Sequence, residues 1–144
     1  MPFDDPDKQA LIDGLNEDLA HELGAVTTYL LFAEMVRGPH RASLSRLFES
    51  EIDDEIKHAR FLAGKIVALG GLPTGEAKGV QLSWDPKRMV EIVREAERET
   101  IVRYERRIQQ ADTVGEVGLR VVLEEFIADE TSHMEEMDRV LAGW

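Results

Sequence analysis

Two short motifs of the same kind stand far apart in the chain. Glu55 and His58 are three positions apart, and Glu130 and His133 repeat that spacing. On an α-helix, a spacing of i, i+3 places both side chains on one face, one turn apart. Carboxylate oxygens and imidazole nitrogens are ligands for iron, manganese and zinc. A single motif of this kind usually marks a solvated face, whereas two on apolar faces indicate a metal site.

Two single glutamates, Glu22 and Glu97, complete the pattern. Each precedes one of the motifs by 33 residues, and a tyrosine follows each of them by seven. The two halves of the chain therefore look like an internal repeat displaced by 75 residues, as a duplicated helix hairpin would produce. Tyr29 and Tyr104, the two tyrosines, are expected mainly as core aromatics. Tyr29 is also a candidate electron donor beside the metals.

The charges of these residues suit two metal ions. Four ionised glutamates would balance two divalent cations, and a low-dielectric interior can accept a site that is near neutral. Without metal, several of the carboxyl groups should bind protons with raised pKa values. Glu55 and Glu130 are expected to bridge the two ions, because each shares a helix face with a histidine. Glu22 and Glu97 would then be terminal ligands.

Four long segments must position these side chains. Each shows apolar residues at intervals of three and four, as an amphipathic helix requires, and each apolar face includes one of the four glutamates. Short breaks follow the first and third segments, whereas the stretch at about 70–85 is long enough to cross a bundle. The segments are residues 7–37, 40–69, 86–111 and 114–142.

Counting along the chain places the glutamates at one level. Glu22 lies 16 residues before Gly38, and Glu55 lies 16 residues after Pro39. At a rise of about 1.5 Å per residue, both lie roughly 24 Å from that turn. The second pair has similar offsets from the turn near residue 112. We therefore predict an all-α four-helix bundle, with a long crossover between helices two and three and the ligands in its middle.

Local signals mark the starts of two helices. Asp85 and Pro86 are typical of an N-cap and the first helical position. Thr113 with Glu116 resembles a capping box for the last helix. Acidic residues beside the motifs are expected to form a solvated or supporting face: Glu51, Asp54 and Asp129. The arginines of the third segment alternate with glutamates and are expected in a salt-bridged surface or subunit contact: Arg94, Arg98, Arg103, Arg106 and Arg107.

With these motifs the sequence resembles the ferritin-like superfamily, and the bacterioferritins in particular. The matching stretches are residues 15–23 with Tyr29, 54–59 and 129–133, and the likeness extends over all four helical segments. The resemblance implies a single ferritin-like domain over residues 1–144. It also implies a di-iron ferroxidase centre that oxidises Fe(II) with oxygen or hydrogen peroxide, for iron storage or detoxification. Its ligands would be Glu22, Glu55, His58, Glu97, Glu130 and His133, with Tyr29 beside them.

Three positions depart from the bacterioferritin pattern. Ile56 stands where haem-binding members carry a methionine, so we expect no haem. Ser50 stands where some members carry an inner-surface histidine. Trp144 follows His133 by eleven residues, without the short fifth helix that lines a channel in 24-subunit shells. A homo-oligomer in the form of a dimer or a smaller shell is therefore expected.

Other functions would use the same ligands. Manganese or zinc would also suit the site, which could then serve a manganese catalase, a rubrerythrin-like peroxidase or a di-iron oxygenase. The chain has no cysteine, so a rubrerythrin with its own rubredoxin-type site is not expected. A third alternative is a structural bundle that its metals merely hold together.

Composition and net charge limit the classes of binding partner. The chain has 144 residues, of which 43% are hydrophobic, and its formal net charge is −12. That charge disfavours binding to nucleic acid and to anionic membranes. The absence of cysteine excludes disulfides and thiolate metal sites. The acidic start resembles no signal peptide and no apolar run reaches about 18 residues, so a cytoplasmic protein is expected.

Overall fold

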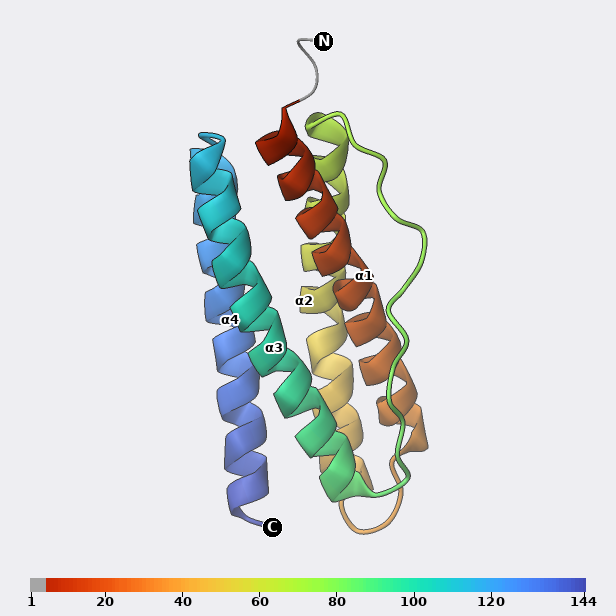
Figure 1. The fold of residues 1–144 in the computed structure, drawn as a ribbon. Helices are drawn as coiled ribbons and strands as arrows, with labels where there is room; N and C mark the ends of the chain where they lie inside the picture. The colour runs from red at the N-terminus through yellow and green to blue at the C-terminus, as the bar shows by residue number, and fades with distance from the viewer. Residues whose placement is uncertain (1–4) are drawn as a thin grey trace.

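Four long helices pack side by side as a bundle in the computed structural model, which describes residues 5–144 (Figure 1). The all-α fold and the four predicted segments are confirmed, with ends that differ by a few residues. None of the helices is long and apolar enough to cross a membrane. The expectation drawn from the acidic start falls partly on residues 1–4, outside the described residues. The helices are α1 (Pro6–Met35), α2 (Arg41–Ala68), α3 (Pro86–Thr113) and α4 (Val117–Ala142).

Helix α3 begins as predicted, and helix α4 does not. The carboxylate of Asp85 accepts a hydrogen bond from the Lys87 amide, and proline occupies the first turn. The predicted capping box is wrong, because α3 continues through Thr113, whose hydroxyl donates to the carbonyl of Gln109 at 3.0 Å. The chain then turns at Gly115, where φ is +77°, and α4 starts without a side-chain cap.

The linker between α2 and α3 runs along the outside of α1 for most of the bundle's length (Figure 1). The side-chain amide of Asn16 donates to the Leu72 carbonyl at 3.1 Å and accepts from the Thr74 amide at 2.8 Å. Farther along, the Lys78 amide donates to the Ala20 carbonyl at 2.8 Å. The linker thus returns the chain to the end where α2 began, which confirms the predicted long crossover and makes α2 and α3 parallel.

Two apolar clusters fill the interior, one toward each end of the bundle. One cluster contains Leu15, Leu62 and Leu123, and the other contains Phe32 and Phe48. The glutamates and histidines of the predicted site lie between them. The apolar clusters shield this middle layer from water at both ends.

Gly14 of α1 lies directly against the side chain of Arg107. A Cβ atom at this position would be 1.8 Å from Arg107 Nη1. Because Asp18 holds that guanidinium at 2.7 Å, Gly14→Ala should lower the free energy of unfolding by about 1–3 kcal/mol, despite alanine's better helix propensity. Gly64→Ala on α2, where a Cβ meets nothing within 4 Å, should raise it by up to about 1 kcal/mol. Urea unfolding followed by circular dichroism checks both, and equal shifts would contradict the packing argument.

Candidate metal centre

The six predicted ligands meet in the middle of the bundle. They come from all four helices, and each is at most 6% exposed. The level predicted by counting residues from the turns is therefore where the side chains lie. Helix α1 carries Glu22, α2 carries Glu55 and His58, α3 carries Glu97, and α4 carries Glu130 and His133.

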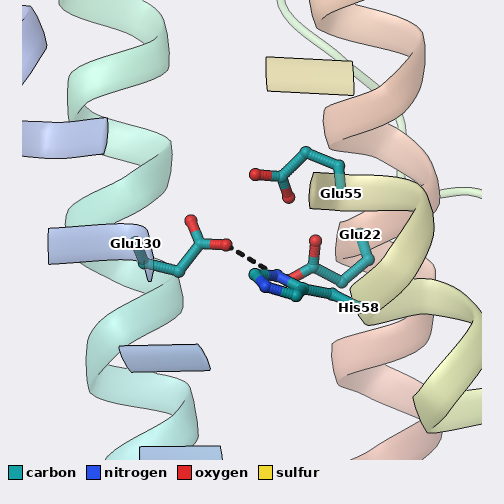
Figure 2. Close-up of side chains that lie close together, drawn as sticks. All are labelled: Glu22, Glu55, His58 and Glu130. Atoms are coloured by element: carbon teal, nitrogen blue, oxygen red, sulfur yellow. Dashed lines mark ion pairs between the residues drawn. The ribbon is translucent and has the colours of Figure 1, made fainter. Parts of the chain in front are cut away.

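The cluster consists of two overlapping groups of four. In each group, one ligand atom per residue lies within 4.8 Å of the others. Figure 2 shows the first group, in which Glu130 reaches from α4 toward His58 on α2, with Oε1 2.9 Å from Nδ1. Glu55 and Glu130 belong to both groups. The first group adds Glu22 and His58, and the second adds Glu97 and His133.

The cluster's inner atoms fit a metal site better than a hydrogen-bonded network. Six buried atoms make no well-aligned hydrogen bond within the part of the chain that the structure describes, although two of them, His58 Nδ1 and Glu130 Oε1, form an ion pair at 2.9 Å. Leaving so many buried polar atoms without a hydrogen bond is costly. All six are carboxylate oxygens or imidazole nitrogens, which are the donors that iron, manganese and zinc accept. They are Oε2 of Glu22 and Glu97, Oε1 of Glu55 and Glu130, and Nδ1 of both histidines.

Two carboxyl groups of the cluster, those of Glu55 and Glu97, resist ionisation. Burial raises the pKa of Glu55 well above its usual range, and the charges of Glu22 and Glu97 raise it further. Burial also raises the pKa of Glu97. Burial opposes ionisation of Glu22 too, but its polar contacts with Glu55 and His58 outweigh that effect and lower its pKa. Burial therefore favours the protonated form of Glu55 in the metal-free cluster.

The surroundings of the two histidines favour the protonated, positively charged form of each ring. Burial opposes their protonation, but the surrounding carboxylates outweigh it and raise the pKa of both rings. Glu22 and Asp129 act on His58, and Glu51 acts most strongly on His133. The layer thus holds protons where metal cations would otherwise balance its charge.

Each histidine is oriented by an aspartate from the other half of the chain. Asp129 Oδ2 lies 2.9 Å from Nε2 of His58, and Asp54 Oδ2 lies 3.0 Å from Nε2 of His133. These contacts turn both Nδ1 atoms toward the cluster. Carboxylates in this position fix the ring and its tautomer in metal sites. Asp54 and Asp129 thus make the contacts expected of supporting residues, and their role beside bound metal stays a prediction.

Comparison with known proteins agrees with this arrangement. Residues 12–143 match the ferritin-like domain family. The chain belongs to the ferritin-like family. A bacterioferritin of Streptomyces coelicolor is 30% identical over 132 residues, and the match covers 91% of this chain and 79% of the bacterioferritin. A bacterioferritin of Mycobacterium leprae is 29% identical over 139 residues, and the match covers 96% of this chain and 86% of the bacterioferritin.

A solved structure is similar in both fold and sequence. It comes from Bacillus anthracis str. Ames and is described as ferritin-like and diiron-carboxylate. It is 49% identical, with a TM-score of 0.93, and the match covers 95% of this chain and 99% of that one. The predicted family and four-helix fold are confirmed, and the buried cluster is compatible with a di-metal site.

Both tyrosines of this ferritin-like protein touch the cluster. The Tyr29 hydroxyl donates a hydrogen bond to Glu97, and the Tyr104 hydroxyl donates one to Glu22. Burial raises the pKa of both phenols well above 10, so both remain donors at neutral pH. Tyr104 was expected only as a core aromatic. The repeated seven-residue spacing from glutamate to tyrosine was the signal for its second role.

The two halves of the ferritin-like bundle differ beside the histidines. Glu51 lies with Oε2 2.6 Å from His133 Nε2 and is buried. The residue 75 positions later is Phe126, which stacks on His58 with ring centroids 4.0 Å apart. One histidine is therefore covered by a carboxylate and the other by an apolar ring. Glu51 was expected in a solvated or supporting face, and its spacing of four positions from Glu55 could have shown that it faces inward.

Two arginines expected in a surface network are buried instead. Arg107 is held by Asp18, with Nε to Oδ2 at 2.7 Å and Nη2 to Oδ1 at 3.0 Å. Arg103 lies beside the same carboxylate, with its Nε 4.0 Å from Oδ1. The expectation was wrong for these two residues because Asp18, from α1, supplies a buried partner for them on α3. Arg98, by contrast, is exposed and pairs with Glu95 as expected.

Proposed function

We propose that this ferritin-like protein oxidises Fe(II) with oxygen or hydrogen peroxide, for iron storage or detoxification. The observation that carries the proposal is the pair of overlapping groups that share Glu55 and Glu130 and direct inward donor atoms that lack hydrogen bonds. The likeness to bacterioferritins and to a diiron-carboxylate structure supports iron as the metal. The cluster's donors would also accept manganese or zinc, so iron itself is the point to test.

Each predicted ligand has a place in this proposal. Glu22 and His58 would hold one ion, and Glu97 and His133 the other. Glu55 and Glu130 would bridge the two ions, because each belongs to both groups. Two ferrous ions release two electrons, which with two protons reduce oxygen to hydrogen peroxide or hydrogen peroxide to two waters.

The rest of the chain prepares the cluster for that chemistry. Asp54 and Asp129 keep the imidazole Nδ1 atoms pointing inward, and the apolar clusters exclude water from the two ends of the layer. Tyr29 and Tyr104 hold Glu97 and Glu22 through hydrogen bonds. Binding of metal would release the protons that the cluster retains. Tyr29 is also proposed as an electron donor close to the ions.

Replacing either tyrosine with phenylalanine should weaken metal binding without unfolding the bundle. Each change removes the hydroxyl that holds one terminal glutamate, and loss of such a supporting contact typically costs about tenfold to 100-fold in metal affinity. We expect about tenfold for Tyr29→Phe and for Tyr104→Phe, measured by zinc competition with a chelator. If Tyr29 also supplies an electron, only Tyr29→Phe will slow iron oxidation once both sites are saturated.

Aerobic titration of the metal-free protein with Fe(II) tests the function. We expect rapid protein-dependent oxidation of the first two Fe(II) ions per chain, seen as near-ultraviolet absorbance of the ferric product. Oxidation no faster than in protein-free buffer would contradict the ferroxidase proposal. Catalase activity after manganese loading would then favour a manganese enzyme, and retained fold without redox activity would favour a structural role.

Assembly decides whether oxidised iron can also be stored. We propose a homo-oligomer, either a dimer or a small shell. Analytical ultracentrifugation before and after the titration distinguishes them. Saturation near two irons per chain in a dimer would indicate turnover alone, whereas soluble uptake far beyond two in a larger particle would establish storage.

A further inference from the structure

A cavity of about 310 Å³ lies between α1 and α3, beside the linker that passes along α1. Its inner end is formed by cluster residues, among them Tyr29, Glu55 and Glu97. Residues 78–81 of the linker form part of its outer wall. One water occupies about 30 Å³, so the cavity is far larger than oxygen or peroxide requires. Its size is that of a small-molecule site.

Three glutamates of the cluster, Glu55, Glu97 and Glu130, form the inner end of the cavity, whereas positive charge predominates on the outer part of its wall. Lys78, Arg88 and Arg103 line it, and the side chains of Lys78 and Arg88 make no hydrogen bond or ion pair with residues 5–144. Of the two carboxylates on the outer wall, Glu95 is already in a 2.6 Å ion pair, which leaves Glu99. This outer part of the wall favours the charged end of an anion.

Arg103 offers a specific anchor for that anion. It is only 9% exposed, and its Nη2 donates to Thr100 Oγ1 at 2.8 Å. Its Nε is buried and has no hydrogen-bond partner among the described residues. The nearest carboxylate, on Asp18, is 4.0 Å from Nε and is bound more closely by Arg107. Two buried guanidinium groups thus share one carboxylate, and a buried donor is left without its acceptor.

Apolar side chains face the same space. Ile92 and Val93 of α3, Ala25 of α1 and Val80 of the linker line the cavity. A ligand that suits both parts of the wall has an anionic end and an aliphatic body. Inorganic phosphate would meet the charge but would leave the apolar part of the cavity unfilled.

We propose that this cavity binds a small organic carboxylate with a short aliphatic body. The carboxylate accepts a hydrogen bond from Arg103, and Lys78 and Arg88 add long-range attraction. The aliphatic part packs on Ile92 and Val93 and ends beside the metal cluster. This ligand site is additional to iron oxidation and does not depend on it.

Calorimetric titration of the full chain with butyrate tests the proposal, in the metal-free and in the zinc-loaded state. Zinc has no redox chemistry, so the result is independent of iron oxidation. Butyramide has the same shape without the charge, and phosphate has charge without the aliphatic body. We expect butyrate to bind, and to bind at least tenfold more tightly than either comparison compound.

Variants locate the ligand. Arg103→Gln should weaken butyrate binding at least tenfold, and Ala25→Leu should do so by filling the cavity while Arg103 is kept. Arg106→Gln, an exposed position on the same helix, should bind butyrate within twofold of the unmodified chain. Circular dichroism confirms the fold of each variant. Equal binding of butyrate and butyramide, phosphate binding in place of butyrate, or butyrate binding unchanged in Arg103→Gln would each overturn the proposal.

Discussion

Replacing Glu130 with alanine is expected to abolish rapid Fe(II) oxidation while the four helices persist. Glu130 belongs to both groups of the cluster, so its loss removes a donor from both proposed metal positions. Loss of a supporting contact already costs up to about 100-fold in affinity or activity, and loss of a shared ligand should cost at least that much. Zinc binding and the initial oxidation rate measure the effect, and helix content is followed by circular dichroism.

Glu125→Ala is the matched control for this experiment. Glu125 lies on the same helix and is exposed, so its removal should leave both binding and oxidation within twofold. Unchanged zinc binding and unchanged oxidation in Glu130→Ala would remove Glu130 from the site. Loss of zinc binding with unchanged oxidation would place the oxidation elsewhere on the protein.

Arg107→Met should destabilise the bundle strongly at neutral pH. The side chain of Arg107 donates two hydrogen bonds to Asp18, and both residues are buried. Methionine keeps much of the volume but leaves the carboxylate unsolvated and nearly unpaired. Removing one partner of a buried ion pair typically costs about 3–5 kcal/mol. Urea unfolding at pH 7 measures the loss, and exposed Arg106→Met should change the free energy of unfolding by less than about 0.5 kcal/mol.

The same variant should show a characteristic pH dependence. Burial already raises the pKa of Asp18, against the opposing effect of Arg107. Without the arginine the pKa of the folded state rises further above the unfolded value, so the folded state binds the additional proton. The deficit is then largest at neutral pH and shrinks as the pH falls through the raised pKa. A deficit that grows between pH 7 and pH 5 would contradict this account.

The level of the cluster could be predicted because long helices convert residue counts into distance. Glu22 and Glu55 lie equally far from the turn at Gly38, so antiparallel packing brings them together whatever the surrounding side chains are. The four helix segments could be predicted because apolar residues recur at intervals of three and four along each of them. The turn before α4 could not be predicted in this way. The sequence around Thr113 is compatible both with a capping box and with the last turn of the preceding helix.

Contacts between helices distant in the chain were harder to predict. Arg103 and Arg107 look like members of a charged surface until Asp18 of α1 is placed beside them. Periodicity describes one helix at a time and does not show which charged side chains two helices will bury together. Tyr104 could have been recognised, because the internal repeat gives it the same relation to the cluster as Tyr29.

The aspartate–histidine and tyrosine–glutamate contacts that orient the cluster run between the halves of the chain. His58 is held by Asp129, and Tyr29 by Glu97, with the reciprocal contacts made by the residues 75 positions away. A lone two-helix hairpin with this pattern would lack its own orienting groups and could complete the centre only by pairing with a twin. When two such hairpins are joined in one polypeptide, their sequences can diverge independently. Glu51 and Phe126 occupy equivalent positions in the two halves. Two identical hairpins could not carry a carboxylate at one of these positions and an aromatic ring at the other.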